Sequence, residues 1–172
     1  MLDTPWLQVH EDSYRRPDGR ELTRFLSLDE PDGVNVVVVT PAQTLLLVRQ
    51  FRPALGRTVF DFPAGLVEAG EDPLDCARRE LLEETGYASD SWIATGSIEP
   101  APHRLRKTEH CFLAVGAEPV AEPAQDENEE LELLARPVDD VDRMIREGEF
   151  TCAVCIASLA LARLHAPEHL RT

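Results

Sequence analysis

The sequence predicts an α+β fold: an α/β/α sandwich in which helices cover both faces of a mixed sheet, preceded by an antiparallel hairpin. Three observations favour this fold. Strand-like segments fill the first third of the chain, a helical segment separates them from further strands, and two helical segments come last. This order is typical of a domain in which helices pack on a sheet. A chain of 172 residues is long enough for one domain with a substantial core, so we expect a single domain over residues 1–172.

The first thirty residues predict the hairpin. Residues 6–14 partly alternate between apolar and polar side chains, and residues 22–28 form a second strand-like run. Between them, residues 16–20 (Arg-Pro-Asp-Gly-Arg) carry the proline and glycine that are typical of a turn. A hairpin alone is only marginally stable in water, so the segment 1–30 needs packing from elsewhere.

The sheet and the last two helices follow from the remaining pattern. Valine-rich residues 34–40 predict a buried strand, and residues 44–50 predict a strand that pairs back after a turn. Apolar side chains from Val138 onward share one helical face until Gly148, and a second, mostly apolar helix is expected over residues 151–165. Further strands are predicted at 91–97, 110–115 and 130–135.

A central helix is predicted between Asp72 and Gly86. Asp72 followed by Pro73 has the form of an N-cap with proline in the first helical position, and Gly86 has the form of a C-terminal stop. Between these ends, apolar residues recur at helical spacing and give the segment one apolar face. They are Leu74, Ala77, Leu81 and Leu82.

Glu80, Glu83 and Glu84 break two local rules of helix stability. At 3.6 residues per turn, they fall within an arc of roughly 100°. They repel one another, and in the last turn the helix dipole disfavours anions. Such conflicts usually mark a functional site, and a hard divalent cation with oxygen ligands, such as Mg²⁺, would resolve both. A solvated acidic face is the alternative, but it does not explain the glycines, Arg79 and Glu71 at fixed offsets.

The segment from Gly65 to Tyr87 has a specific spacing. After Gly65 come five residues, Glu71, seven residues, Arg79-Glu80-Leu81, one residue, Glu83-Glu84, one residue and Gly86-Tyr87. This pattern resembles the Nudix box, the signature of hydrolases that split a diphosphate linked to another moiety. Only the last position departs, because Tyr87 stands where a bulky aliphatic residue is usual.

The resemblance implies a fold, a cofactor and residue roles. It implies the same sandwich fold and a Mg²⁺ ion, for which Mn²⁺ can substitute. The carbonyl of Ala64, with Glu80 and Glu84, would hold the metal, and Glu83 would bind or orient groups around it as a catalytic residue. Gly65, Glu71, Arg79 and Gly86 would be structural residues of the box.

Similarity to the ADP-ribose and nucleoside-diphosphate-sugar pyrophosphatases extends beyond the box. It is carried by residues 48–53 (Val-Arg-Gln-Phe-Arg-Pro), by residues 62–65 (Phe-Pro-Ala-Gly) and by Pro102, at the position that commonly marks the ADP-ribose group. Asp61 stands where those enzymes usually carry glutamate. Residues 126–129 (Asp-Glu-Asn-Glu) resemble a late acidic loop, which would make Glu127 a candidate general base and Glu129 a candidate metal ligand. A charged surface loop is the alternative reading.

Two groups of basic residues are candidates for substrate binding. Arg52 could clamp a phosphate, or it could be an ordinary arginine at the end of a strand. After Pro102 the chain continues His103-Arg104-Leu105-Arg106-Lys107, and four potentially cationic side chains so close together suit phosphate. If this loop faces the metal, it would favour free nucleoside di- or triphosphates over ADP-ribose; if it is a solvated loop, it says nothing about the substrate.

Cys152 and Cys155 form a Cys-x-x-Cys pair, which can indicate redox chemistry or zinc. They lie in an apolar helical run, and Cys76 and Cys111 are isolated in the sequence, so buried core thiols are the favoured interpretation. His103 and His110 have no partner at zinc spacing.

Together these features predict a Mg²⁺-dependent hydrolase of a nucleoside-diphosphate-linked substrate, either ADP-ribose or a nucleoside-diphosphate sugar. The alternatives are a hydrolase of free nucleoside di- or triphosphates and a non-catalytic nucleotide-binding module.

The net charge of −15 argues against nucleic acid or an anionic membrane as partner. The start of the chain lacks signal-peptide features, so a cytoplasmic location is expected. The resemblance further suggests a homodimer, with the 1–30 hairpin as a possible dimerisation element.

Overall fold

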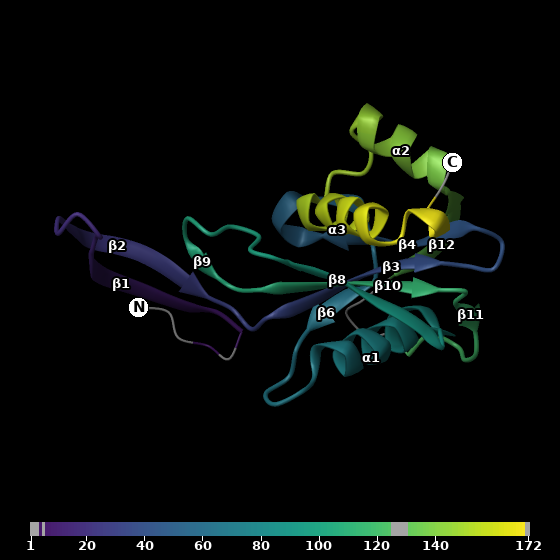
Figure 1. The fold of residues 1–172 in the computed structure, drawn as a ribbon, viewed down its shortest axis with the longest axis horizontal. Coiled ribbons are helices and arrows are strands. Elements are labelled where there is room, and N and C mark those ends of the chain that lie inside the picture. The colour runs from purple at the N-terminus through teal and green to yellow at the C-terminus, as the bar shows by residue number, and fades with distance from the viewer. Residues whose placement is uncertain (1–3, 5, 125–130, 171–172) are drawn as a thin grey trace.

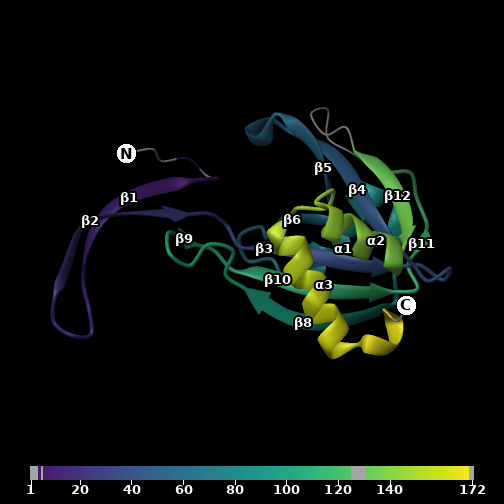
Figure 2. The same ribbon diagram turned by 90° about the horizontal axis from the view of Figure 1, so that it is seen from above.

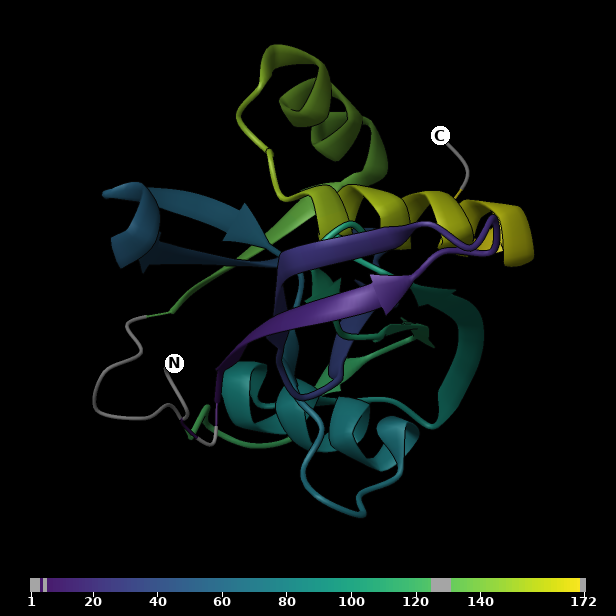
Figure 3. The ribbon, with the colours of Figure 1, turned by 90° about the vertical axis from the view of Figure 1, so that its left-hand side faces the viewer.

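The protein is built in three layers, with helices on both faces of a central sheet (Figure 1). The structure, a computed structural model, describes residue 4 and residues 6–124 and 131–170. Helix α1 (Pro73–Thr85) covers one face of the sheet, and helices α2 (Val138–Glu147) and α3 (Ala153–His165) cover the other, as Figure 3 also shows from the side. The predicted α+β class and the α/β/α layering are confirmed.

The central sheet is mixed. Its main strands run in the order β12-β4-β3-β10-β8; β5 pairs with β4, and β6 pairs with β3. The β3–β10 pair is parallel and the other pairs are antiparallel. These strands are β3 (Gly33–Val39), β4 (Thr44–Arg52), β5 (Arg57–Asp61), β6 (Ala64–Leu66), β8 (Ser91–Ile98), β10 (Glu109–Val115) and β12 (Glu132–Pro137). A two-stranded ribbon pairs β7 (Tyr87–Ala88) with β11 (Glu118–Pro119), and two short 3-10 helices span Pro53–Leu55 and Pro167–His169.

Strand β3 divides the core into two halves, because successive side chains of a strand point to opposite faces. Val36 and Val38 pack in the half that contains α1. Val37 and Val39 pack in the half that contains α2 and α3, and Asn35 shares their face. Every residue of β3 is buried. The valine run is thus buried on both faces, and β3 lies between the two helical layers.

The ends of α1 match the sequence prediction. The side chain of Asp72 accepts a hydrogen bond of 2.8 Å from the backbone N–H of Leu74, and Pro73 opens the helix. Gly86 ends it with a φ of 71°, and its N–H donates to the Leu82 carbonyl at 2.8 Å. A Cβ at Gly86 would lie 2.1 Å from the carbonyl oxygen of Ala121, so both backbone conformation and space require glycine here.

The N-terminal hairpin extends away from the three-layer body (Figures 1 and 2). Strand β1 (Gln8–Arg15) pairs antiparallel with β2 (Glu21–Asp29), which confirms the predicted hairpin. The short strand β9 (Leu105–Arg106) pairs parallel with β2 and joins the hairpin to the body. Among the described residues, no helix is long and apolar enough to cross a membrane.

Candidate active site

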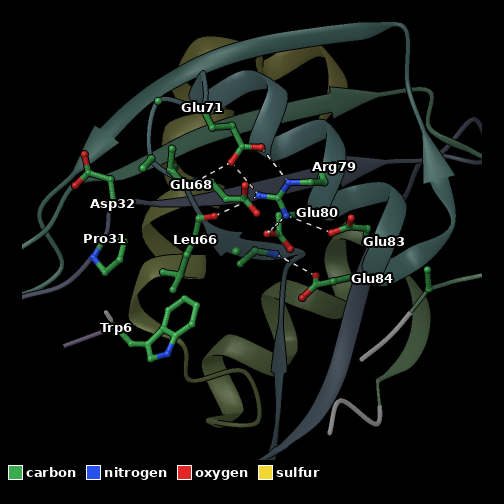
Figure 4. A pocket seen from close by; sticks show the side chains of 16 residues that line it. Trp6, Pro31, Asp32, Leu66, Glu68, Glu71, Arg79, Glu80, Glu83 and Glu84 are labelled. Carbon is green, nitrogen blue, oxygen red and sulfur yellow. Dashed lines mark hydrogen bonds and ion pairs between the residues drawn. The ribbon is translucent and has the colours of Figure 1, made fainter. Parts of the chain in front are cut away.

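A cavity of about 1080 Å³ lies beside α1. One wall is formed by the polar face of α1 and by the segment from Ala64 to Glu71, while Trp6, Pro31 and Asp32 lie opposite (Figure 4). Glutamate side chains dominate this wall: Glu71 from the preceding segment and Glu80, Glu83 and Glu84 from α1 all line the cavity. We refer to it as the α1 cavity.

The three glutamates of α1 line this cavity, and one of them, Glu84, contacts the backbone of Ala64. Glu84 is 8% exposed, and its Oε2 accepts a hydrogen bond of 3.1 Å from the Ala64 N–H. The Glu80 side chain is 14% exposed and that of Glu83 is 48% exposed. The helix therefore presents two nearly buried carboxylates and one that reaches solvent at the rim.

Gly65 makes the close approach of Glu80 possible. A Cβ at Gly65 would lie 1.9 Å from the carboxyl carbon of Glu80, so any side chain at this position would displace the Glu80 carboxylate. The absence of a side chain thus forms a cradle in which the Glu80 carboxylate rests against the backbone next to Ala64. Arg79 Nη1 donates to Oε1 of the same carboxylate at 2.7 Å.

Arg79 links the box residues into one network. Its Nε and Nη2 each donate a 2.9 Å hydrogen bond to one oxygen of Glu71, and its Nη1 also reaches Glu83 Oε2 at 3.2 Å. The Glu68 N–H donates a further 2.9 Å bond to Glu71 Oε2. These bonds, with that from Arg79 the largest, lower the pKa of Glu71 to about 2. The Glu71 carboxylate in turn raises the pKa of Arg79, so the pair stays ionised.

Arg52 does not reach the α1 cavity. Its Nη2 and Nε donate to Oδ2 of Asp61 at 2.8 and 3.2 Å. Both residues line a second, smaller cavity of about 230 Å³, which Ala64 also borders. The predicted phosphate clamp is therefore held by a carboxylate of the chain itself.

The basic loop 103–107 is also directed elsewhere. Arg106 forms ion pairs with Asp12 at 3.1 Å and Asp29 at 3.2 Å on the hairpin, and Lys107 lies 3.5 Å from Glu30. His103 and Arg104 are exposed, and no residue of this loop lines the α1 cavity in the described part of the chain. Carboxylates near the hairpin already balance the charge of Arg106 and Lys107, because β9 attaches this loop to β2. Phosphate is not needed to balance those two charges.

Glu127 and Glu129, the predicted base and metal ligand of the late acidic loop, lie outside the described residues. The structure adds other residues to the α1 cavity that sequence patterns did not select, including Trp6, Asp32 and Glu68. Asp32 stands in Pro31-Asp-Gly33, a pattern typical of a turn that does not by itself indicate a functional residue. Its Oδ1 accepts a 2.7 Å bond from the Thr108 N–H, and this long-range contact has no local sequence signature.

The four cysteines fall into two groups. Cys76 and Cys111 are buried in different parts of the core. Cys152 is the N-cap of α3 and Cys155 lies in its first turn, where both thiols approach Asp61 in the smaller cavity. Burial raises the pKa of Cys155, while a hydrogen bond from Cys155 lowers the pKa of Cys152. The interpretation as core thiols holds for the burial of Cys155 but misses this polar neighbour.

Comparison with known proteins names the family to which this fold and this cluster of carboxylates belong. The NUDIX domain model matches residues 29–153. The chain is 30% identical over 144 residues to an ADP-ribose pyrophosphatase of Bacillus subtilis (strain 168), covering 83% of this chain and 77% of that protein. This chain therefore belongs to the Nudix family and is a Nudix hydrolase, as the box predicted.

Two further comparisons agree with this assignment. An ADP-sugar pyrophosphatase of Mus musculus is 27% identical over 180 residues, which cover 94% of this chain and 83% of that one. The crystal structure of an ADP compounds hydrolase superposes with a TM-score of 0.84 at 20% identity, covering 100% of this chain and 92% of that chain. The structural match shows a shared fold. The hairpin β1–β2 lies almost entirely before the segment that the family model covers.

Nudix hydrolases in general use a divalent metal ion, and the residues of the α1 cavity fit one. The donors that converge there are carboxylate oxygens, which suit a hard cation such as Mg²⁺. The cradle at Gly65 holds Glu80 beside the Ala64 backbone, and Glu84 is held there by the Ala64 N–H. A cation would also relieve the repulsion among the three glutamates.

Proposed function

We propose that this Nudix hydrolase splits the diphosphate bond of a nucleoside diphosphate linked to a sugar, either ADP-ribose or a nucleoside-diphosphate sugar, with Mg²⁺ as its cofactor. The observation that carries the proposal is the convergence of Glu80 and Glu84 on the Ala64–Gly65 backbone. The names of the relatives, ADP-ribose pyrophosphatase and ADP-sugar pyrophosphatase, support the substrate class. Mn²⁺ would substitute for Mg²⁺, since it accepts similar oxygen ligands.

Each residue of the site has a proposed role. The carbonyl of Ala64 and the carboxylates of Glu80 and Glu84 would hold the metal. When bound, Mg²⁺ would neutralise the diphosphate and lower the pKa of the attacking water. Glu83, the most exposed of the three glutamates, would orient that water or take its proton. Glu127 is the second candidate for the base and Glu129 for a further ligand.

Arg79 and Glu71 would act as positioning residues. The two parallel bonds between them fix the guanidinium plane, which leaves Nη1 to hold Glu80 and Glu83. A rigid fork of this kind sets the direction of two carboxylates at once, and lysine could not reproduce it. Catalytic geometry is sensitive to displacements of about 1 Å, so this network matters for rate even though it lies behind the reacting groups.

Product analysis by phosphorus NMR tests the proposal. The protein is incubated with Mg²⁺ and, separately, with ADP-ribose, nucleoside-diphosphate sugars, and free nucleoside di- and triphosphates. A nucleoside monophosphate plus a sugar phosphate, formed only when Mg²⁺ is present, is the expected result. Inorganic phosphate or pyrophosphate from free nucleotides alone would instead favour the second substrate class. Binding without cleavage of any compound would indicate a nucleotide-binding module.

We also propose that the protein acts as a homodimer through its hairpin, with residues 1–172 forming one functional unit per subunit. The hairpin extends from the body and exposes apolar side chains, including Leu22 at 39% and Leu26 at 48%. Trp6, 69% exposed, lies at the edge of the α1 cavity. A second copy would cover these groups. Light scattering at micromolar concentration should give twice the 19.2 kDa chain mass; a mass of one chain would exclude the dimer.

A further inference from the structure

The smaller cavity holds a second cluster of metal-type ligands, separate from the glutamates of α1. Asp61, Cys152 and Cys155 each offer one ligand atom, and all these atoms lie within 4.8 Å of one another. The distance from Cys155 Sγ to Asp61 Oδ1 is 3.8 Å. Zinc–sulfur bonds of about 2.3 Å in a tetrahedral site separate ligand atoms by roughly 3.5–4 Å, so the cluster is already close to the spacing that zinc requires.

Neighbouring groups orient these ligands. Arg52 and Gln50 both donate to Oδ2 of Asp61, at 2.8 and 3.3 Å for the closest contacts. Its other oxygen, Oδ1, therefore faces Cys155. The backbone N–H of Phe62 donates to Cys155 Sγ at 3.3 Å, a contact that stabilises negative charge on sulfur. Groups in this outer position typically fix the ligands of a metal and tune its affinity.

Asn35 gives an independent sign of a missing ligand. This residue is 2% exposed and lines the same cavity, and its Nδ2 lies 3.5 Å from Cys155 Sγ. Its side-chain oxygen is buried and has no hydrogen-bond partner among the described residues. A buried acceptor without a donor is rare and costly. A cation in the cavity, or a water bound to that cation, would satisfy it.

We propose that Asp61, Cys152 and Cys155 form a zinc site, with the Asn35 oxygen or a water as the fourth ligand. Two thiolates select zinc over Mg²⁺, which prefers oxygen ligands alone. Each thiol that binds releases its proton to solvent. The two thiolates and Asp61 then carry three negative charges, which the zinc ion and Arg52 together balance. This site goes beyond the proposed hydrolase activity and does not depend on it.

The proposed zinc site adjoins the segment that leads into the box. Asp61 begins the segment that continues through Phe62 to Ala64, and Ala64 borders both cavities. Zinc would join this segment to the first turn of α3, which comes from the far end of the chain. It would therefore fix the backbone on which the Glu84 contact depends.

Cobalt titration of the full-length, reduced and metal-free protein tests the site. Co²⁺ bound by thiolate gives an intense charge-transfer absorption, whereas Co²⁺ on the α1 glutamates does not, so this site is observed independently of the hydrolase site. We expect the band to saturate at one Co²⁺ per chain, to persist in excess Mg²⁺ and to disappear when one equivalent of Zn²⁺ is added. Absence of the band in the wild-type protein would overturn the proposal.

Substitutions show which residues produce the charge-transfer band. Cys152→Ala, at the half-buried N-cap, and Cys155→Ala should each reduce the band strongly, and Asp61→Asn should weaken Co²⁺ binding tenfold or more. Cys111→Ala is the matched control: it removes another buried thiol and should leave the band intact. Circular dichroism checks that each variant is folded. If Cys155→Ala does not fold, the band in Cys152→Ala decides whether the site exists. A band that survives in Cys152→Ala, or that is lost in folded Cys111→Ala, would exclude the site.

Discussion

Gly33 lies against the carboxylate of Glu109, which lines the smaller cavity, just as Gly65 lies against the carboxylate of Glu80 in the α1 cavity. A Cβ at Gly33 would lie 2.5 Å from Glu109 Oε2, and one at Gly65 would lie 1.9 Å from the carboxyl carbon of Glu80. Neither glycine has a positive φ, so a side chain at either position would disturb the neighbouring glutamate rather than strain the backbone. In each case a largely buried glutamate rests against bare backbone. The two contacts differ in their surroundings, since only Glu80 belongs to the carboxylate cluster of α1.

Gly65→Ala should therefore abolish most of the activity. The added methyl group must push the Glu80 carboxylate out of its cradle, and a displacement of about 1 Å at a catalytic centre can reduce the rate by 10²-fold. We expect kcat/KM for ADP-ribose with Mg²⁺ to fall by about that factor or more. Steady-state kinetics on the folded variant measures the effect.

Gly33→Ala is the matched control for this substitution, because it also places a methyl group against a glutamate. It should lower stability while kcat/KM per folded molecule changes little. If the two variants lost activity equally, the loss would reflect general disruption of the fold, and the argument for the Gly65 cradle would fail.

Glu84→Gln should separate activity from stability. Glutamine keeps an oxygen that can accept the Ala64 N–H, so the local structure is preserved, but the negative charge needed for the metal is lost. We expect kcat to fall by about 10²-fold or more, on the scale of removing a transition-state stabilising group. Repulsion with Glu80, one turn away, would also fall, so the melting temperature should stay the same or rise slightly. Near-full turnover would show that Glu84 is not a metal ligand.

The order of elements was predictable because each long element carries its own local signal. Helix α1 was bounded correctly by Asp72 and Gly86, and the valine run of β3 was correctly assigned as a buried strand. Strands β5 and β6 were missed. Gly56, Pro63 and Gly65 interrupt that segment, and its pairing with β4 and β3 comes from tertiary contacts rather than from alternation.

The site was predictable to the extent that it depends on one helix. Glu80, Glu83 and Glu84 share a helical face by spacing alone, and the structure brings them together at the α1 cavity. The partners of Arg106 were not predictable, because Asp12 and Asp29 lie more than seventy residues away along the chain. The local density of basic residues suggested a phosphate site, but in the structure Arg106 and Lys107 form ion pairs with carboxylates that are distant in the sequence.

Leu26→Asp should weaken self-association through the hairpin. Leu26 is 48% exposed on β2, and a charge there would be costly to bury against a second copy. We expect the dimer of this variant, measured by light scattering, to dissociate at a higher protein concentration than the wild-type dimer does. Leu164→Asp is the control, since Leu164 is 78% exposed near the end of α3, away from the hairpin, and should leave the mass unchanged. An unchanged dimer in Leu26→Asp would remove this residue from the interface.

Acid should destabilise the protein partly through Glu71. Bonding to Arg79 lowers the pKa of Glu71 from 4.5 to about 2 in the folded chain. A lowered folded-state pKa contributes stability that is fully present above the unfolded value of about 4.5 and is lost as the pH falls towards 2. Glu71→Gln should therefore be less stable than the wild type at neutral pH, and the difference should shrink across this range in urea unfolding. In an Arg79→Ala background the substitution should have little additional pH-dependent effect, because the partner that lowers the pKa is gone. An equal pH dependence in both backgrounds would mean that Arg79 does not set the ionisation of Glu71.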